Sequence, residues 1–299
     1  MKALIVGCGY VGIATGRLLL ASGHEVHGVR RSQAGLDTLA AAGIRPLHGD
    51  ISDAASMASW PREWDVVVNA ASSAGGGVDA YRAVYLRGTQ NLIEHLGRAA
   101  VRCFVHVGST SVYGQWDGSW VDEGSPTEPR SEAARVLVAT EQALRDAWEQ
   151  RGFPAIVLRA SGIYGPERGH ARQELLRGRA RIDGDGSRWL NMVHRDDVAG
   201  AIVAAAAGGR PGRTYNVTDD EPVRQRDLLA WLATRLGCPM PGPREDANPR
   251  PSTRAPTNKR VSNRRLRDEL GWTPRFPSYR EGYAEACPVP GSTPDIGPG

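Results

Sequence analysis

The sequence predicts an α/β fold, a doubly wound parallel sheet of the Rossmann type with a small C-terminal substrate lobe. Short apolar, β-branched runs alternate with segments of helical period, which is typical of strands buried on both faces of a parallel sheet. The first run, residues 2–6, leads directly into Gly7-Cys8-Gly9-Tyr10-Val11-Gly12, and a helical pattern follows. We expect a dinucleotide-binding domain over 1–160, a mainly substrate-binding lobe with late elements returning to the sheet over 161–287, and a disordered tail over 288–299.

The glycine-rich loop indicates a dinucleotide because strand, loop and helix follow one another in register. Gly7 permits a tight turn, Gly9 lets the backbone approach a pyrophosphate, and Gly12 lets the helix pack close to the strand. The backbone N–H groups at the start of that helix, at Tyr10 and Val11, face the phosphates. An ordinary tight turn between a strand and a helix is the alternative.

The end of the second strand, residues 25–29, indicates which dinucleotide is bound. An Asp or Glu usually holds the ribose there when the cofactor lacks a 2′-phosphate. This chain has Arg30, Arg31 and Ser32 instead. Guanidinium groups and a hydroxyl suit a 2′-phosphate, so NADP(H) is preferred and NAD(H) remains possible. A solvated basic turn is the alternative.

The third strand brings two more candidates to the same edge of the sheet. A helix over 35–42 and a strand over 44–50 place Asp50 and Ile51 beside the adenine. Asp50 capping the segment that opens at Ser52 is the alternative.

The fourth and fifth strands complete the cofactor half. A buried strand over 65–71 ends in Asn69-Ala70-Ala71, where an open α/β sheet places its ligand. A helix from 78 to about 99 and a strand over 103–107 follow, and that strand delivers residues 108–114 to the same edge. This alternation predicts right-handed crossovers.

Composition excludes several classes of function. The chain has 299 residues and a formal net charge of +4, and the basic residues are scattered, so nucleic acid binding has little support. The four cysteines lie far apart and form no metal-ligand or redox pair, so we expect no metal and reduced thiols in a cytoplasmic protein. No apolar run approaches membrane length, so no membrane partner is expected.

Short motifs follow a fixed order along residues 1 to about 280. They are Gly7-x-Gly9-x-x-Gly12, His48-Gly49-Asp50, Asn69-Ala70-Ala71, Gly88-Thr89-Gln90-Asn91-Leu92, Ser109-Thr110-Ser111-Val112-Tyr113-Gly114, Arg159-Ala160-Ser161-Gly162-Ile163-Tyr164-Gly165-Pro166, Val193-His194-Arg195-Asp196-Asp197-Val198-Ala199, Tyr215-Asn216-Val217 and Leu270-Gly271-Trp272-Thr273-Pro274. Together these pieces resemble the extended short-chain dehydrogenases/reductases of the NAD-dependent epimerase/dehydratase kind.

The resemblance implies hydride exchange between a nicotinamide and a hydroxyl or carbonyl compound, assisted by a Tyr-x-x-x-Lys pair whose lysine lowers the pKa of the phenol. In the family, glutamates flank this pair at fixed spacings, and Glu123 and Glu141 keep those spacings. The register puts Ala133 and Leu137 at the positions of the pair, so the pair is absent. The Arg-Val-Leu run at 135–137 is similar to that of an atypical subgroup with the same loss.

Other residues are candidates for the missing catalytic groups. Ser109 aligns with the family's catalytic serine, and Ser111 lies in the same loop. We predict that Tyr85 supplies the phenol from the neighbouring helix, with Arg135 lowering its pKa or holding substrate. The alternatives are a hydroxyl-rich turn, a packing tyrosine and a surface arginine.

The C-terminal half supplies the substrate candidates. The resemblance implies that Gly165 and Pro166 lie along the nicotinamide, and that a basic residue of a late strand contacts substrate phosphate. The substrate candidates are Tyr113, Arg168, His194, Lys259 and Arg260. Solvated charge is the alternative for Arg168. His194 is structural or substrate-lining, and Asp196 or Asp197 is expected to cap the helix over 198–207.

The preferred function is an NADP(H)-dependent oxidoreductase or epimerase-like enzyme of an atypical subgroup, acting on a polar small-molecule hydroxyl or carbonyl compound, anionic ones included. A catalytically silent NADP(H)-binding regulator and a sugar-nucleotide epimerase/dehydratase are the alternatives. By analogy with the family, the helices around 80–98 and 132–148 suggest a homodimer. The helix residues offered for that interface are Leu86, Leu96, Val136 and Leu144.

Overall fold

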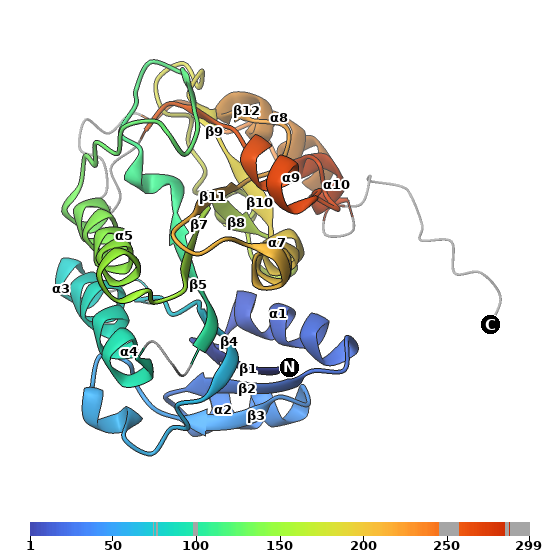
Figure 1. Ribbon diagram of the computed structural model, residues 1–299. Coiled ribbons are helices and arrows are strands. Elements are labelled where there is room, and N and C mark those ends of the chain that lie inside the picture. The colour runs from blue at the N-terminus through green and yellow to red at the C-terminus, as the bar shows by residue number, and fades with distance from the viewer. Residues whose placement is uncertain (74, 76, 98–100, 245–256, 285–286, 288–299) are drawn as a thin grey trace.

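The computed structural model describes residues 1–73, 75, 77–97, 101–244, 257–284 and 287. Its centre is a seven-stranded sheet of β1 (Lys2–Val6), β2 (Glu25–Arg30), β3 (Arg45–His48), β4 (Trp64–Asn69), β5 (Val101–Ser109), β7 (Ala155–Ala160) and β11 (Thr214–Val217). The strand order is β11-β7-β5-β4-β1-β2-β3, and every neighbouring pair is parallel. The predicted doubly wound parallel sheet is confirmed (Figure 1).

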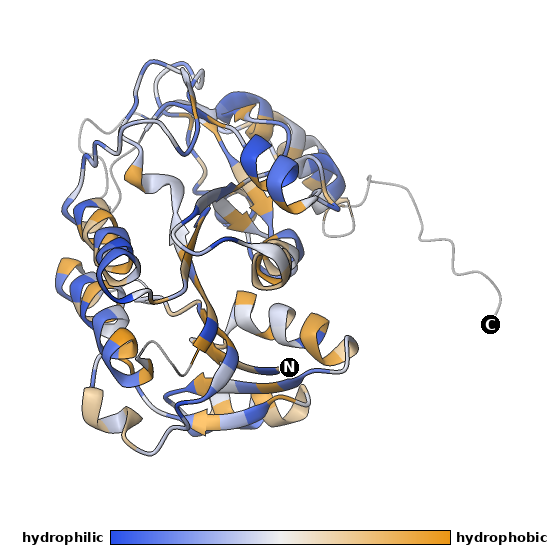
Figure 2. Cartoon of the chain, in the orientation of Figure 1, coloured by the Kyte–Doolittle hydropathy of each residue, from blue (hydrophilic) through white to orange (hydrophobic). Residues whose placement is uncertain are grey.

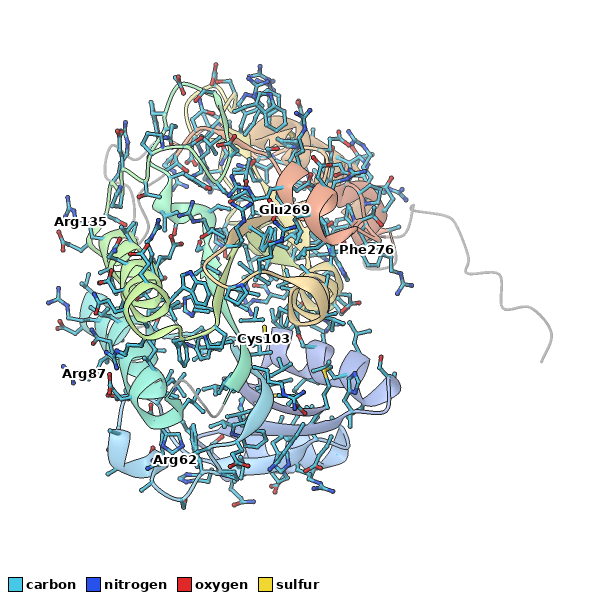
Figure 3. All side chains as sticks on the ribbon, viewed as in Figure 1. Arg62, Arg87, Cys103, Arg135, Glu269 and Phe276 are labelled. Carbon is cyan, nitrogen blue, oxygen red and sulfur yellow. The ribbon has the colours of Figure 1, made fainter. Side chains whose placement is uncertain are left out.

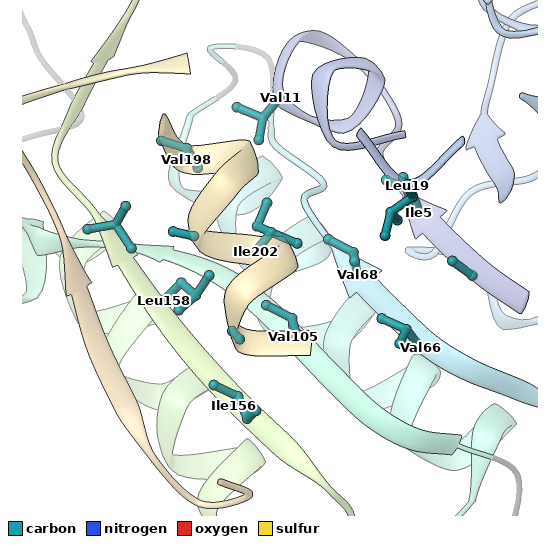
Figure 4. Close-up of a cluster of buried hydrophobic side chains, with 14 of the residues drawn as sticks. Ile5, Val11, Leu19, Val66, Val68, Val105, Ile156, Leu158, Val198 and Ile202 are labelled. Atoms are coloured by element: carbon teal, nitrogen blue, oxygen red, sulfur yellow. The ribbon is translucent and has the colours of Figure 1, made fainter. Parts of the chain in front are cut away.

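Helices α1 (Tyr10–Ala21), α2 (Gln33–Ala41) and α7 (Arg195–Gly208) cover one face of the sheet. Successive residues of a strand point to opposite faces, so each buried strand contributes to two cores. On this face Val198 and Ile202 of α7 pack over Val105, Ile156 and Leu158, as Figure 4 shows. Burying such aliphatic side chains contributes roughly 1.5–3 kcal/mol each.

The opposite face is covered by α4 (Gly88–Leu96) and α5 (Glu132–Arg151), which pack against Leu4, Val67 and Phe104. In Figure 2 orange residues recur along the strands between blue and white ones, and the flanking helices carry both orange and blue stretches. Strands that are apolar on both faces need helices on both sides, which fixes the three-layer arrangement.

The C-terminal lobe has its own small core. It comprises α6 (His170–Leu176), α8 (Gln225–Leu236), α10 (Tyr279–Tyr283) and the paired short strands β8 (Gly162–Tyr164) with β10 (Met192–His194) and β9 (Trp189–Leu190) with β12 (Val223–Arg224). Strand β6 (Trp120–Val121) pairs with β13 (Arg260–Val261), which precedes α9 (Arg264–Leu270). Strand β11 returns from this half to the main sheet, and the tail over 288–299 lies outside the described residues.

The helix expected from 78 to about 99 is interrupted. Helix α3 (Val78–Tyr81) continues into a π-helical turn, Arg82–Arg87, before α4 begins. A π turn accommodates an extra residue, re-aims the side chains within it and is frequent at functional sites. This turn carries Tyr85.

The structure corrects the prediction that Leu86, Leu96, Val136 and Leu144 form a homodimer interface. Three of these side chains are buried within the protein's own core. Leu96 and Leu144 pack in the cluster against the sheet, and Val136 packs in the cluster that contains Tyr81 and Tyr113. Leu86 alone of the four is partly buried. These three side chains therefore stabilise the monomer and present no surface to a second copy.

A buried ion pair joins α5 to the sheet. Nε of Arg159, in β7, donates to Oε1 of Glu141 at 3.0 Å, and Nη2 donates to Oε2 at 2.6 Å. Both side chains are almost inaccessible, at 4% and 6% exposed. A buried charge is tolerated only when paired and hydrogen-bonded, so each group requires the other.

The same arginine continues into a polar network. Its Nη1 donates to the Tyr113 hydroxyl at 2.7 Å, and that hydroxyl donates to Oδ1 of Asn216 at 2.9 Å. Asn216 in turn donates from its backbone to Glu123 and from its side chain to the carbonyl of Ser262. The network therefore fixes the loop after β5 against β7, β11 and the segment after β13.

Glu141→Gln should destabilise the protein by about 3 kcal/mol, because it leaves the Arg159 guanidinium buried without a counter-charge. Urea unfolding followed by circular dichroism measures the loss. Glu149→Gln, an exposed glutamate on the same helix, is the matched control and should change stability by less than about 0.5 kcal/mol. Equal effects of the two substitutions would show that the pair contributes nothing.

Asp219, just after β11, is a second buried charge-bearing group. It is 2% exposed, and no side chain among the described residues donates a hydrogen bond to its carboxylate. Burial raises the pKa of this carboxyl to about 9. The charges of Asp220, Glu221 and Asp197 also raise it, and the backbone N–H of Glu221 opposes them. Its neutral form is therefore the one that the fold accommodates.

Since the folded pKa of Asp219 lies above the unfolded one, its contribution to stability is present at low pH and lost as pH rises toward 9. Wild-type stability should therefore fall between pH 5 and pH 8 by about 4 kcal/mol from this group, because each pH unit in that window costs about 1.4 kcal/mol. Asp219→Asn should flatten that slope in urea unfolding at each pH. The exposed Asp268→Asn control should keep the wild-type slope, and an unchanged slope in Asp219→Asn would contradict the assignment.

Candidate cofactor and active site

A cavity of about 510 Å³ lies at the carboxyl ends of the strands. Open α/β sheets bind ligands at this edge, where the strand order reverses on either side of the first strand. The predicted cofactor residues that line it are Gly7, Gly9, Tyr10, Val11, Arg30, Arg31, Ser32, Asp50, Ile51, Ala70 and Ala71. The structure thus brings together residues from the ends of four strands.

The glycine loop forms the floor of this cavity. Gly7 has φ +69°, and a Cβ there would overlap the backbone of Ala71. A Cβ on Gly9 would lie 2.7 Å from Nη1 of Arg30, so this glycine also makes room for a guanidinium. Helix α1 begins without a side-chain cap, which leaves backbone N–H groups at its start for an anion. These features fit a dinucleotide.

The basic end of the cavity lies at the end of β2. Nη1 of Arg31 pairs with Oδ2 of Asp50 at 3.2 Å, and the hydroxyl of Ser32 accepts the Gly35 N–H at the start of α2. Asp50 also accepts the backbone N–H of Ser52 at 2.9 Å. Although burial raises it, the hydrogen bonds from Ser52 and Arg31 lower the pKa of Asp50 overall. Asp50 therefore caps the turn that opens at Ser52 and also lines the cavity.

The opposite end of the cavity carries hydroxyl groups. Oγ of Ser109, at the end of β5, accepts the backbone N–H of Ser111 at 3.2 Å, which leaves its own O–H proton for another acceptor. Tyr85 from the π turn and Leu137 from α5 line the same wall. A hydroxyl, a phenol and an apolar side chain thus share this part of the site.

The model of the NAD-dependent epimerase/dehydratase family matches residues 3–218. The chain belongs to this family. The family assignment that the motifs suggested is confirmed. It also accounts for the position of the cavity, because the matched residues include every strand of the main sheet.

Individual relatives match nearly the whole chain. Protein YeeZ of Escherichia coli (strain K12) is 26% identical over 281 residues, 92% of this chain and 96% of its own length. UDP-glucose 4-epimerase of Mycolicibacterium smegmatis is 30% identical over 315 residues, 95% of this chain and 97% of its own. The structure of DesIV, a dTDP-glucose 4,6-dehydratase from Streptomyces venezuelae with NAD and TYD bound, has a TM-score of 0.80 and 26% identity and covers 95% of both chains.

Four predicted cofactor residues lie beside the cavity without lining it. Gly12, in α1, packs against Ile5 of β1. The buried side chain of Asn69 accepts the backbone N–H of Ala71. Gly165 and Pro166 form a turn that approaches the cavity through Arg168. Gly12 and Asn69 therefore support the loops that form the cavity wall.

Two predicted catalytic residues do not reach the cavity. Arg135 is 58% exposed, pairs with Glu132 and points outward from α5, as Figure 3 shows. It therefore does not accompany Tyr85. The hydroxyl of Ser111 is buried, outside the cavity wall, and has no partner among the described residues.

Most of the predicted substrate residues serve the fold. Tyr113 is fully buried in the Arg159 network, and Lys259 is buried with its Nζ donating to the Tyr113 carbonyl and the Thr257 hydroxyl. Burial lowers the pKa of Lys259 to about 8. Arg260 stacks between Trp120 and Trp189. Of this group, Arg168 alone lines the cavity.

His194 rather than an aspartate caps α7. Its Nδ1 accepts the backbone N–H of Asp196 at 3.2 Å. The Asp197 carboxylate instead accepts the backbone N–H groups of Arg275 and Phe276, and so ties α7 to the segment before α10. The expected aspartate cap is wrong because α7 begins at Arg195, three residues before the predicted start, so both aspartates lie within its first turn.

The cavity is also lined by three residues that the sequence motifs did not identify as site residues: Val84, Ser161 and Ile163. Ser161 and Ile163 follow β7, so the rule that strand ends meet at one edge is the signal that could have identified them. Val84 lies in the π turn, which no sequence pattern predicted. In the described ranges, no group of three metal-ligating side chains occurs, and no helix is long and apolar enough to span a membrane.

Proposed function

We propose that the protein is an NADP(H)-dependent oxidoreductase or epimerase-like enzyme that acts on a polar hydroxyl or carbonyl compound. The observation that carries the proposal is one cavity with two different ends. A pair of arginines and a serine line the cavity where β2 ends, and Ser109 and Tyr85 line it at the end of β5 and in the π turn, with hydroxyls to which we assign the substrate oxygen.

The preference for a 2′-phosphate rests on charge at the end of β2. The residues there are Arg30, Arg31 and Ser32, with no carboxylate on that strand end to accept ribose hydroxyls. Arg31 has Asp50 as its partner, and that carboxylate limits the local positive charge. A phosphate dianion would bind the arginine fork bidentately. DesIV is described with NAD, so this preference is a property inferred for the present chain.

The nicotinamide, when bound, supplies or accepts a hydride. The chain's own residues supply the rest. The Ser109 hydroxyl donates to the substrate oxygen, and the Tyr85 phenol gives or takes the hydroxyl proton. Leu137 and the buried Ala133 stand at the positions that the resemblance assigns to the usual Tyr-x-x-x-Lys pair, and Leu137 makes its part of the cavity wall apolar.

A second function is favoured by one observation. Leu137 places an apolar side chain on the wall where the family's lysine is expected. A catalytically silent NADP(H)-binding regulator would tolerate this side chain, whereas the resemblance implies that a sugar-nucleotide epimerase of the usual kind needs the lysine.

Titration calorimetry should give tighter binding of NADPH and NADP⁺ than of NADH and NAD⁺. Arg31→Ala should weaken NADP⁺ binding at least about tenfold, because a charge-assisted phosphate contact contributes about 1.5–3 kcal/mol, and should leave NAD⁺ binding unchanged. Arg45→Ala, an exposed arginine of the neighbouring strand that pairs with Glu25, is the control. Equal affinities for NADH and NADPH would refute the 2′-phosphate assignment.

Tyr85→Phe should lower NADPH oxidation with a panel of aldehydes and ketones by about 10²–10⁴-fold in kcat, the usual range for general acid–base catalysis. NADPH binding should not change. Tyr81→Phe, one helical turn earlier with its ring 5.0 Å from that of Tyr85, is the matched control. Unchanged turnover in Tyr85→Phe would remove Tyr85 from the mechanism. Absence of turnover in the wild type would favour the regulator.

A further inference from the structure

The tight turn at residues 165–168 presents one side chain to the cavity. Gly165 and Arg168 exchange both backbone hydrogen bonds, at 2.9 and 3.0 Å. Pro166 and Glu167 form the tip, and Glu167 has φ +61°, a left-handed conformation that costs a non-glycine residue about 1–3 kcal/mol. A closed turn with a preset proline has few alternative conformations, so the direction of Arg168 is well defined.

Tyr10 fastens this turn to the start of α1. Its hydroxyl donates to the Pro166 carbonyl at 3.0 Å, and the guanidinium carbon of Arg168 lies 5.0 Å from the centre of its ring. A Cβ on Gly165 would lie 2.8 Å from the same hydroxyl, so only glycine permits this approach. A turn from the C-terminal half is thus held against the glycine loop of the cofactor half.

Arg168 and Arg195 both stack on the Tyr10 ring, and they differ in whether a carboxylate pairs with the guanidinium. Nε of Arg195 donates to Oδ1 of Asp196 at 2.8 Å, so its charge is compensated. Arg168 has no ion pair with any residue that the structure describes, and it lines the mouth of the cavity. Stacking on an aromatic ring orients a guanidinium while leaving its N–H donors available.

The ligand chemistry follows from the position of Arg168. It lies beside Tyr10, whereas the arginine pair for the 2′-phosphate lies at the end of β2. The glycine loop and the uncapped start of α1 suit the pyrophosphate bridge of a dinucleotide. We infer that Arg168 is a cofactor-binding residue that contacts this pyrophosphate from the substrate side, with Tyr10 as its positioning residue. This inference rests on the proposed function.

The test compares three ligands, NADP⁺, NAD⁺ and adenosine 2′-phosphate, in Arg168 variants. NADP⁺ contains the pyrophosphate, whereas adenosine 2′-phosphate has only the 2′-phosphate end. Arg168→Gln should weaken NADP⁺ binding about tenfold, equal to about 1.4 kcal/mol, and weaken NAD⁺ by the same factor. Binding of adenosine 2′-phosphate should stay within about twofold. Arg168→Lys should restore most of the NADP⁺ affinity at low salt, because a lysine keeps the charge.

Variants of Tyr10 separate the stacked ring from the hydroxyl. Tyr10→Leu should reproduce the effect of Arg168→Gln, because it removes the ring that orients the guanidinium. Tyr10→Phe keeps the ring and should bind NADP⁺ more tightly than Tyr10→Leu. Thermal unfolding of each variant checks that the fold is retained.

Three results would overturn the inference. Unchanged NADP⁺ binding in Arg168→Gln would show that Arg168 is a solvated charge. Unchanged NADP⁺ binding with a raised KM for a carbonyl substrate would make it a substrate residue. Equal weakening of NADP⁺ and adenosine 2′-phosphate would show a general distortion of the cavity. Failure of the wild-type protein to bind any dinucleotide is a different result, and would reject the proposed function itself.

Discussion

The buried pair of Arg159 and Glu141 is the constraint on which the geometry of the site depends. The buried guanidinium of Arg159 on β7 loses several kcal/mol of hydration, so α5 must lie where its glutamate reaches β7. That position places Leu137, one helical turn before Glu141, on the cavity wall. The remaining donor of the arginine holds Tyr113 and thereby the loop that begins at Ser109. One charged residue of the sheet thus aligns Leu137 and the loop after β5, which both border the cavity.

Much of the fold could be predicted because parallel strands are apolar on both faces. The runs beginning at Lys2, Glu25 and Ala155 agree with β1, β2 and β7 to within a residue. The cofactor residues could be predicted for a related reason: strand ends of an open sheet converge, so Arg31, Asp50 and Ala71 meet although they are far apart in sequence. The π turn could not be predicted, since no residue pattern distinguishes it from an uninterrupted helix.

The substrate side was harder to predict because polarity does not tell which way a side chain points. Tyr113 and Lys259 are suited to ligand contact, yet both point into the protein, where the network of Arg159 and the Tyr113 carbonyl satisfy them. Arg135 is suited to lowering a phenol pKa, yet it lies on the solvent side of its helix. In each case a tertiary partner determines the direction of the side chain, and that partner is remote in sequence.

The return of β11 to the main sheet limits how the molecule can be divided. The chain leaves the sheet after β7, forms β8, α6 and β10, and comes back only through α7 to β11. A fragment ending near residue 160 would lack Val198 and Ile202, which cover one face of the sheet, so it would expose core side chains to water. The two halves therefore form one cooperative unit. Exchanging the C-terminal lobe with that of a relative while keeping α7 and β11 would require three junctions, one after β7, one before α7 and one after β11.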